Sequence, residues 1–277
     1  LDHYTSLSPS EAFQSEYWPL ELYKQSLASP EQELSRRVVM VTGAASGIGR
    51  AIALRFAKEG AHVVVTDVRL AGAKSVAQEI ARQYGGDCVL YCKLDVSKER
   101  DVKAAFEATR LAFGGLDILV SNAGIAHAGP LDRLSLSRWQ ESLAVNATGH
   151  FLVAKEAVGL LKEQELGGSL IFIATKNVTA PGQDFGAYSA AKAAEAQLAR
   201  VLAIENGAYG IRSNMINPDA IFRDSKLWSP RIREERARAH GIHVEQVEDF
   251  YRQRTLLKTS VTAEDVAEAA LFLAGDR

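Results

Sequence analysis

Two residues with complementary chemistry, Tyr188 and Lys192, stand four positions apart in an alanine-rich stretch. This spacing places both side chains on one face of a helix. A tyrosine with a pKa near 10 is a poor base at neutral pH, but a nearby ammonium group favours the phenolate. Tyr188 can then take a proton from a substrate hydroxyl, or return it in the reverse direction. The pair predicts acid–base chemistry on an alcohol or a carbonyl.

A glycine-rich loop follows the first apolar, β-branched run of the chain. Gly43, Gly47 and Gly49 stand in this loop, with Ser46 and Ile48 between them. Gly43 would allow a tight turn, Gly47 would let backbone approach a pyrophosphate, and Gly49 would let a helix pack closely on the strand. The helix N-terminus then offers N–H groups and its positive dipole end to the phosphates. The loop predicts a dinucleotide site.

Asp67 ends the second apolar run, 18 residues after Gly49. A carboxylate at this place accepts hydrogen bonds from ribose hydroxyls and repels a 2′-phosphate, so we expect NAD as the cofactor. Arg69 lies two residues further on and leaves an NADP-dependent sugar reductase as an alternative.

Short apolar strands alternate with helix-length segments along most of the chain. The expected strands are Val38–Thr42, His62–Thr66, Cys88–Lys93, Ile118–Ser121, Leu170–Ala174 and Ser213–Ile216, and the expected helices lie near 48–59, 70–84, 98–113, 135–163, 187–206 and 263–274. This alternation predicts an α/β fold of the Rossmann type, a doubly wound parallel sheet in three α/β/α layers. Residues 1–36 lack the alternation and are expected to form an aromatic N-terminal arm or linker, with one helix near Pro19–Leu27. Residues 37–277 then form the single catalytic domain.

Composition excludes several classes of partner. With 32 Lys and Arg against 34 Asp and Glu, the net charge of −2 supplies no basic field for nucleic acid. No apolar run is long enough for a membrane helix, and no signal peptide opens the chain. The two cysteines, Cys88 and Cys92, are expected to be reduced thiols of a cytoplasmic protein, and we expect no metal site, including at His240 and His243.

In motif order and spacing, residues from about 38 to 274 resemble the short-chain dehydrogenase/reductase family. Beyond the glycine loop and the Tyr-x-x-x-Lys signature, the matching residues are Asp95, Val96, Asn122, Ala123, Gly124, Asn146, Thr175 and Pro218. The resemblance implies that Asn146, Thr175, Tyr188 and Lys192 are catalytic and that the others line the cofactor. It also implies a homodimer or homotetramer whose shared faces come from the long helices near 135–163 and 187–206.

The chain departs from the family pattern at several positions. Thr175 stands where the family usually has serine, and its hydroxyl keeps the ability to hydrogen-bond a substrate oxygen. Asp219 follows the Asn-Pro pair in place of glycine, and Lys176 replaces a small residue. The family's final strand and tail do not follow Arg277, so we expect this domain to lack its last strand. These departures keep open a second hypothesis for the function, in which the chain is a cofactor-binding scaffold or sensor with weak catalysis.

Several unusual runs, among them Glu16–Tyr23 and Arg233–Arg238, resemble the dehydrogenase domain of bifunctional rhamnulose-1-phosphate aldolase/alcohol dehydrogenase proteins. The resemblance implies that the arm connects to a class II aldolase domain and that the substrate is a small, lactaldehyde-like hydroxyaldehyde or sugar derivative. Basic residues beyond the sixth strand (Arg223, Lys226 and Arg231) either meet an anionic substrate or lie on solvated helix faces. His127 either lines the pocket or is an ordinary loop residue.

Overall fold

The computed structural model describes residues 8–16, 18–27 and 31–275. The chain forms two compact units, residues 1–32 and 33–277. The smaller unit contains helices α1 (Pro9–Glu16) and α2 (Pro19–Leu27). The sequence predicted only the second of them. Helix α1 begins where the Glu11 carboxylate accepts hydrogen bonds from the Ser8 backbone N–H and hydroxyl, a local cap that stabilises a short helix.

The larger unit is built on six parallel strands in the order β3-β2-β1-β4-β5-β6. Their bounds are β1 Val38–Thr42, β2 His62–Asp67, β3 Val89–Lys93, β4 Ile118–Ser121, β5 Gly168–Ile173 and β6 Ile211–Ile216. All the expected strands are present, and the predicted Rossmann-type fold is confirmed. Leu34 is buried in the core of this unit, so the domain begins a few residues before the expected boundary at 37.

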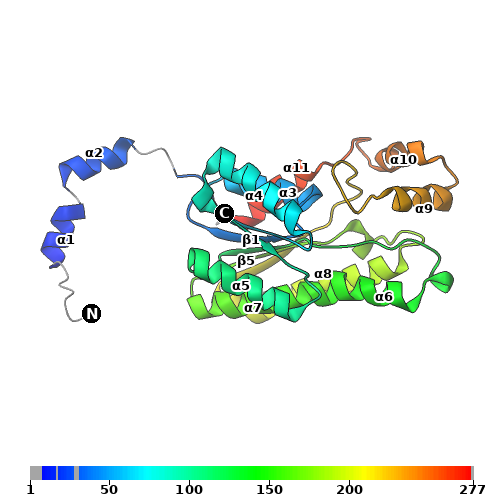
Figure 1. Cartoon of the computed structure of the whole chain (residues 1–277), viewed down its shortest axis with the longest axis horizontal. Coiled ribbons are helices and arrows are strands. Elements are labelled where there is room, and N and C mark those ends of the chain that lie inside the picture. The colour runs from blue at the N-terminus through cyan, green and yellow to red at the C-terminus, as the bar shows by residue number, and fades with distance from the viewer. Residues whose placement is uncertain (1–7, 17, 28–30, 276–277) are drawn as a thin grey trace. The chain divides into compact units, whose positions relative to one another are not determined.

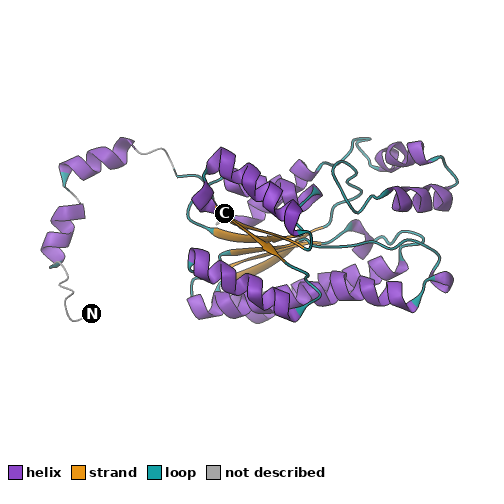
Figure 2. Cartoon of the chain, in the orientation of Figure 1, coloured by secondary structure: helices purple, strands orange, loops and turns teal. Residues whose placement is uncertain are grey.

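Two helical layers enclose the sheet (Figures 1 and 2). Helices α3 (Gly47–Lys58), α4 (Leu70–Tyr84) and α11 (Ala263–Ala274) cover one face, while α5 (Glu99–Phe113), α7 (His150–Gln164) and α8 (Gly186–Asn206) cover the other. Strand β1 shows why: Val39 and Val41 pack into one apolar cluster, whereas Val38 and Met40 pack into the other. Successive side chains along a strand point to opposite faces of the sheet, so one strand contributes to both apolar clusters.

Two local expectations need correction. The helix expected over 135–163 is interrupted: α6 (Leu136–Leu143) passes through a π-helical turn, Ala144–Gly149, before α7 begins. Cys88 lies in a 3₁₀ turn rather than in β3, because Gly85, at φ 106°, ends helix α4 and the chain turns before the strand starts. Both cysteines are free and partly buried, and Cys92 lies in β3, an edge strand of the sheet.

Helices α9 (Pro230–His240) and α10 (Val247–Arg254) form a third packing group beyond the carboxyl ends of the strands (Figure 1). Their apolar side chains pack with Phe185, Tyr188, Phe222 and Trp228 in a separate cluster. These two helices therefore cover the end of the sheet at which parallel α/β folds place their ligands.

Candidate active site

A cavity of about 880 Å³ opens at the carboxyl ends of the strands. Its walls come from the loops after β1 to β4, the end of β5, the first turns of α8 and the segment leading into α9. Because all strands are parallel, their carboxyl ends meet at one edge of the sheet, where residues distant in sequence come together. The volume suits a dinucleotide with a small substrate beside it.

The glycine loop shapes one end of this cavity. Gly43 has a φ of +65°, and a Cβ there would lie 2.9 Å from the Ala123 Cα. A Cβ on Gly49 would lie 2.5 Å from the Gly43 carbonyl oxygen, so α3 can approach the loop only with glycine there. Helix α3 has no acidic residue in its first turn, and the Ser46 side chain does not cap it. The loop thus fits a phosphate group.

Asp67 lies next to that loop and is nearly buried. Its carboxylate accepts hydrogen bonds from the backbone N–H of Ala45 at 3.1 Å and of Arg69 at 2.9 Å. The Arg69 guanidinium lies 3.4 Å from the same carboxylate and also donates to the Ser46 hydroxyl at 3.2 Å. Arg69 is therefore already paired at the place where a 2′-phosphate would have to lie.

Asn122 holds two strand ends together. Its side-chain amide donates to the Thr42 carbonyl oxygen at 2.8 Å, and its backbone N–H donates to the Thr42 hydroxyl at 2.9 Å. Asp95 accepts hydrogen bonds from the Ser97 backbone and hydroxyl, which fixes the loop after β3. These bonds fix two loops that form cavity walls.

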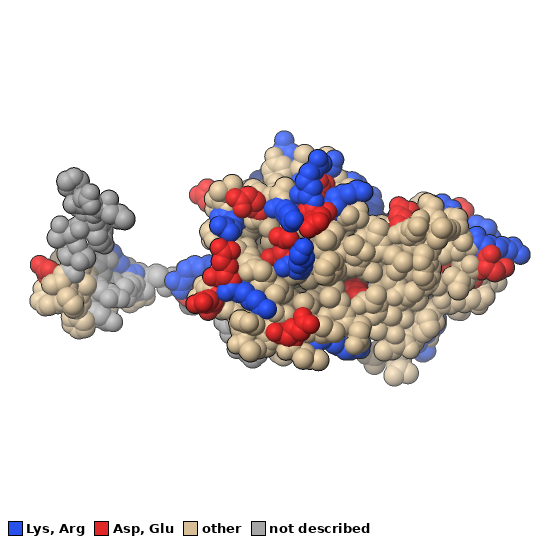
Figure 3. Space-filling view, turned by 90° about the horizontal axis from the view of Figure 1, so that it is seen from below, with Lys and Arg blue, Asp and Glu red and all other residues tan. Residues whose placement is uncertain are grey.

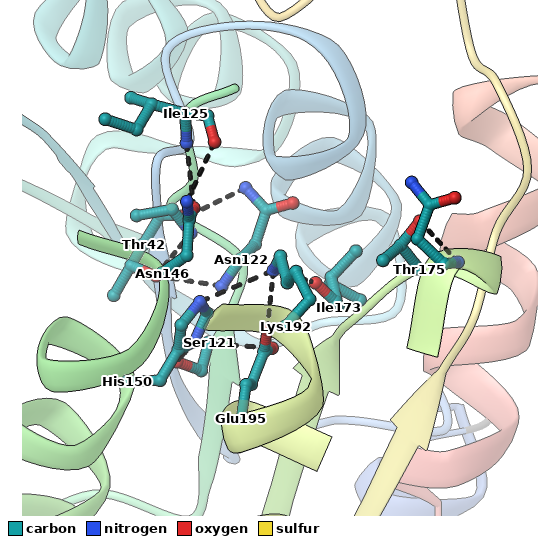
Figure 4. A network of polar contacts seen from close by, with 12 residues as sticks. Thr42, Ser121, Asn122, Ile125, Asn146, His150, Ile173, Thr175, Lys192 and Glu195 are labelled. Carbon is teal, nitrogen blue, oxygen red and sulfur yellow. Dashed lines mark hydrogen bonds and ion pairs between the residues drawn. The ribbon is translucent and has the colours of Figure 1, made fainter. Parts of the chain in front are cut away.

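Asn146 occupies the π-helical turn and is fully buried. Its amide oxygen accepts from the Ile125 N–H, and its amide nitrogen donates to the Ile125 carbonyl, both at 2.9 Å (Figure 4). A Cβ on Gly124 would lie 3.1 Å from this amide oxygen and 3.9 Å from the Lys192 ammonium. A side chain at Gly124 would crowd Asn146, so glycine there keeps the space between Asn146 and Lys192 open.

Tyr188 and Lys192 lie on successive turns of α8, as their spacing predicted, and both line the cavity. Burial raises the pKa of Tyr188; the Lys192 charge and a hydrogen bond to Thr175 act to lower it, and the Glu195 carboxylate acts to raise it. From the sequence we expected the Lys192 ammonium, together with the positive nicotinamide ring of the cofactor, to favour the phenolate. Among the chain's own groups desolvation outweighs the ammonium, so the net direction is upward.

Lys192 is itself held in a buried polar cluster, shown in Figure 4. Its ammonium donates to the Ile173 carbonyl at 2.8 Å and lies 2.6 Å from the Glu195 carboxylate. His150 Nε2 lies 3.5 Å from the same ammonium. Glu195 and His150 were missed from the sequence. The one available signal was a glutamate three residues after Lys192, on the same helical face.

The structure brings most of the predicted residues together. Those on the cavity wall are Gly43, Ser46, Gly47, Ile48, Asp67, Asp95, Val96, Asn122, Ala123, Gly124, Tyr188 and Lys192. Four others are not among the wall residues. They are Gly49 and Asn146 as described, Thr175, whose hydroxyl accepts from the Asn177 N–H, and Pro218, whose carbonyl accepts from the Lys176 N–H.

The remaining candidates, His127 and the basic residues beyond β6, divide into cavity-lining and solvent-facing residues. His127 lines the cavity and lies 2.9 Å from Glu141, and Lys226 also reaches the wall. Arg223 is three-quarters exposed and pairs with Asp224 and Glu264, while Arg231 pairs with Glu235 on α9. The solvated-face alternative therefore fits Arg223 and Arg231, and the pocket alternative fits His127 and Lys226.

Residues 8–16, 18–27 and 31–275 contain neither a candidate metal site nor a candidate membrane-spanning helix. No group of three or more histidine, cysteine, aspartate or glutamate side chains is placed to hold a metal ion. Over the same ranges, no helix combines the length and apolar character that a membrane crossing requires.

A doubly wound parallel sheet, a dinucleotide-type glycine loop and a Tyr–Lys pair on one cavity wall define a Rossmann-type oxidoreductase. The family model described as enoyl-(acyl carrier protein) reductase matches residues 43–277. The chain belongs to the short-chain dehydrogenase/reductase family, as its motifs predicted.

Individual relatives agree with this assignment. YuxG, an oxidoreductase of Bacillus subtilis, is 47% identical over 277 residues; the match spans the whole chain but only 40% of that relative. D-threitol dehydrogenase of Mycolicibacterium smegmatis is 34% identical over 88% of this chain and 87% of its own length. The 3-ketoacyl-(acyl-carrier-protein) reductase of Brucella melitensis, solved with NADH, superposes with a TM-score of 0.76 at 31% identity, covering 87% of this chain and 92% of that structure.

Proposed function

We propose that this chain oxidises and reduces a small hydroxy or carbonyl compound with NAD, using Tyr188 as the acid–base group. The observation that carries the proposal is that Tyr188 and Lys192 share one cavity with the glycine loop and Asp67. The bound nicotinamide would accept the hydride that leaves the carbinol carbon. Tyr188 takes the hydroxyl proton in oxidation and returns it in reduction.

The other residues have separate tasks in this proposal. Thr175, hydrogen-bonded to Tyr188, orients the substrate oxygen. Lys192 holds the nicotinamide ribose; its ammonium has three N–H donors and already makes contacts with Ile173 and His150. Asn146, whose amide oxygen and nitrogen are both held by the Ile125 backbone, keeps the space beside Gly124 open for a water molecule.

We propose that the substrate is a small polyol or hydroxyaldehyde of the lactaldehyde type. The cavity wall carries polar groups, including His127, Glu141 and Lys226, that can hydrogen-bond substrate hydroxyl groups. A relative that is a D-threitol dehydrogenase supports this class. The test is NAD reduction with L-lactaldehyde, 1,2-propanediol and D-threitol. Turnover of at least one supports the proposal, whereas dinucleotide binding without turnover of any favours the scaffold alternative.

Cofactor choice gives a separate prediction. In Asp67→Asn the carboxylate charge is lost and Arg69 is released, so we expect the preference for NADH over NADPH to fall by about tenfold or more. Dissociation constants from the fluorescence of the two reduced cofactors measure this without any substrate. Adding Arg69→Ala should remove most of the gain in NADPH binding. An unchanged preference in Asp67→Asn would show that Asp67 does not discriminate.

The expected oligomer also stays a proposal. Figure 3 looks onto the α5, α7 and α8 side, and much of its right-hand half carries few charged side chains. Phe151, Val201 and Ile204 are exposed on α7 and α8, with Ile204 at 84%. We expect a dimer or tetramer by light scattering, and Ile204→Glu should lower the mass toward the monomer. A parent protein that is already monomeric would contradict the proposal.

The connection to an aldolase domain rests on resemblance alone. The match to YuxG leaves 60% of that relative's length outside it, and nothing in the match describes that part. The mass and the aldolase activity of the native protein test whether an aldolase domain is attached to this one.

A further inference from the structure

A buried glutamate lies directly against the lysine of the acid–base pair. Glu195 has no exposed surface, Lys192 is 2% exposed, and their charged atoms lie 2.6 Å apart. The two residues are three positions apart on α8, and the contact lacks the alignment of a good hydrogen bond. Two opposite charges enclosed together at this distance present little net charge to their neighbours.

His150 encloses the pair from α7. Its Nδ1 lies 2.6 Å from the Ser121 hydroxyl and 3.5 Å from Glu195 Oε1, while its Nε2 faces the Lys192 ammonium. Burial and the Lys192 charge lower the pKa of His150, so the ring is neutral. A backbone hydrogen bond with Ala123 acts to raise the pKa of His150 but does not outweigh burial and the Lys192 charge.

Beyond Lys192, which lines the cavity, this cluster does not continue to solvent. His150, Ser121 and Glu195 are all at most 2% exposed, and Ser121 lies on the central strand β4. A proton passed from Lys192 to His150 would therefore end inside the core. The arrangement can set the local charge around Lys192, but through these residues it offers no path by which a proton could reach solvent.

We propose that Glu195 is a positioning residue that offsets the positive charge which Lys192 presents to Tyr188, holding Tyr188 in its protonated form over a wider pH range. This inference rests on the proposed acid–base role of Tyr188. The titratable groups that face Glu195 are His150 from α7 and Lys192 and Tyr188 from α8 itself. Ser121 from β4 faces the same cluster through His150 and does not titrate in this range.

The charge state of Glu195 determines the direction in which it shifts the titration of Tyr188. Burial raises the pKa of Glu195 to about 7, against the opposing effect of Lys192, so the carboxylate is ionised throughout the range in which a tyrosine titrates. An ionised Glu195 disfavours the Tyr188 phenolate. A protonated Tyr188 is the form that donates to a carbonyl oxygen, so the cluster favours reduction at neutral pH and moves oxidation to higher pH.

The test is a titration of Tyr188 that needs no turnover. With tyrosine labelled by carbon-13 at Cζ and NAD at saturation, the signal lost in Tyr188→Phe identifies Tyr188. In Glu195→Gln its titration midpoint should fall by about one pH unit relative to the parent. Glu205→Gln, at an exposed position on the same helix, should leave the midpoint unchanged.

A second variant keeps the test decisive if the glutamine disturbs folding. Glu195→Met has similar volume and no charge, and thermal unfolding shows whether each variant is folded. A downward shift in whichever folded variant is measured supports the proposal, and an unchanged or higher midpoint overturns it. With any substrate found to turn over, the rising limb of the oxidation pH profile should shift by the same amount. Failure to find a substrate leaves the Tyr188 titration fully interpretable, so the two proposals fail separately.

Discussion

Replacing Tyr188 by phenylalanine is expected to lower kcat by about 10²–10⁴-fold, because the proton of the reacting hydroxyl loses its acceptor. Dinucleotide affinity should change little, since the glycine loop and Asp67 are unchanged in this variant. Single-turnover NADH formation, compared with NADH binding by fluorescence, measures the two effects separately.

The matched control for this variant is Tyr209→Phe. Tyr209 follows the end of α8, is about half exposed, and has the Lys162 ammonium over its ring. Removal of this hydroxyl should leave kcat unchanged. A Tyr188→Phe enzyme that keeps more than roughly a tenth of the parent rate would assign the proton transfer to another group.

Replacing Lys192 by methionine is expected to lower the free energy of unfolding by about 3–5 kcal/mol, because the variant leaves the buried Glu195 carboxylate without its partner. The double variant Lys192→Met/Glu195→Gln should recover most of this loss, since no buried charge remains. Urea unfolding of the parent and of both variants measures the three free energies.

The loss of unfolding free energy in Lys192→Met is expected to grow as pH rises. The folded-state pKa of Glu195, about 7, already lies above the ordinary value of 4.5 for a glutamate, so this group's contribution to stability falls as pH rises between those values. Without Lys192 the carboxyl group stays protonated to still higher pH, and the destabilisation should be smaller at about pH 6 than at about pH 9. Lys155→Met, at a half-exposed lysine on α7, is the control and should cost less than about 1 kcal/mol. Equal losses in the single and double variants would show that the ion pair is not the cause.

Local patterns in the chain were sufficient for the fold and for the outline of the site. Strand β1 could be predicted because five consecutive apolar or β-branched residues precede a glycine turn, and α11 because Thr262 and Asp265 form a capping box that the structure contains. Tyr188 and Lys192 could be paired because a helix fixes the direction of side chains four residues apart. The glycine loop and Asp67 could be placed together because adjacent parallel strands end at the same edge.

The sequence by itself therefore determined the Rossmann-type fold, the family and the residues that meet at the carboxyl ends of the strands. Which polar and charged groups surround Lys192 was decided only by the tertiary structure. Ser121, His150 and Glu195 come from β4, α7 and α8, and no spacing in the chain relates them. The net direction of the Tyr188 pKa was also decided there, because desolvation depends on every element packed against a side chain. Spacing along the chain records which residues share a face, whereas burial and charge are properties of neighbours that the folded chain alone brings together.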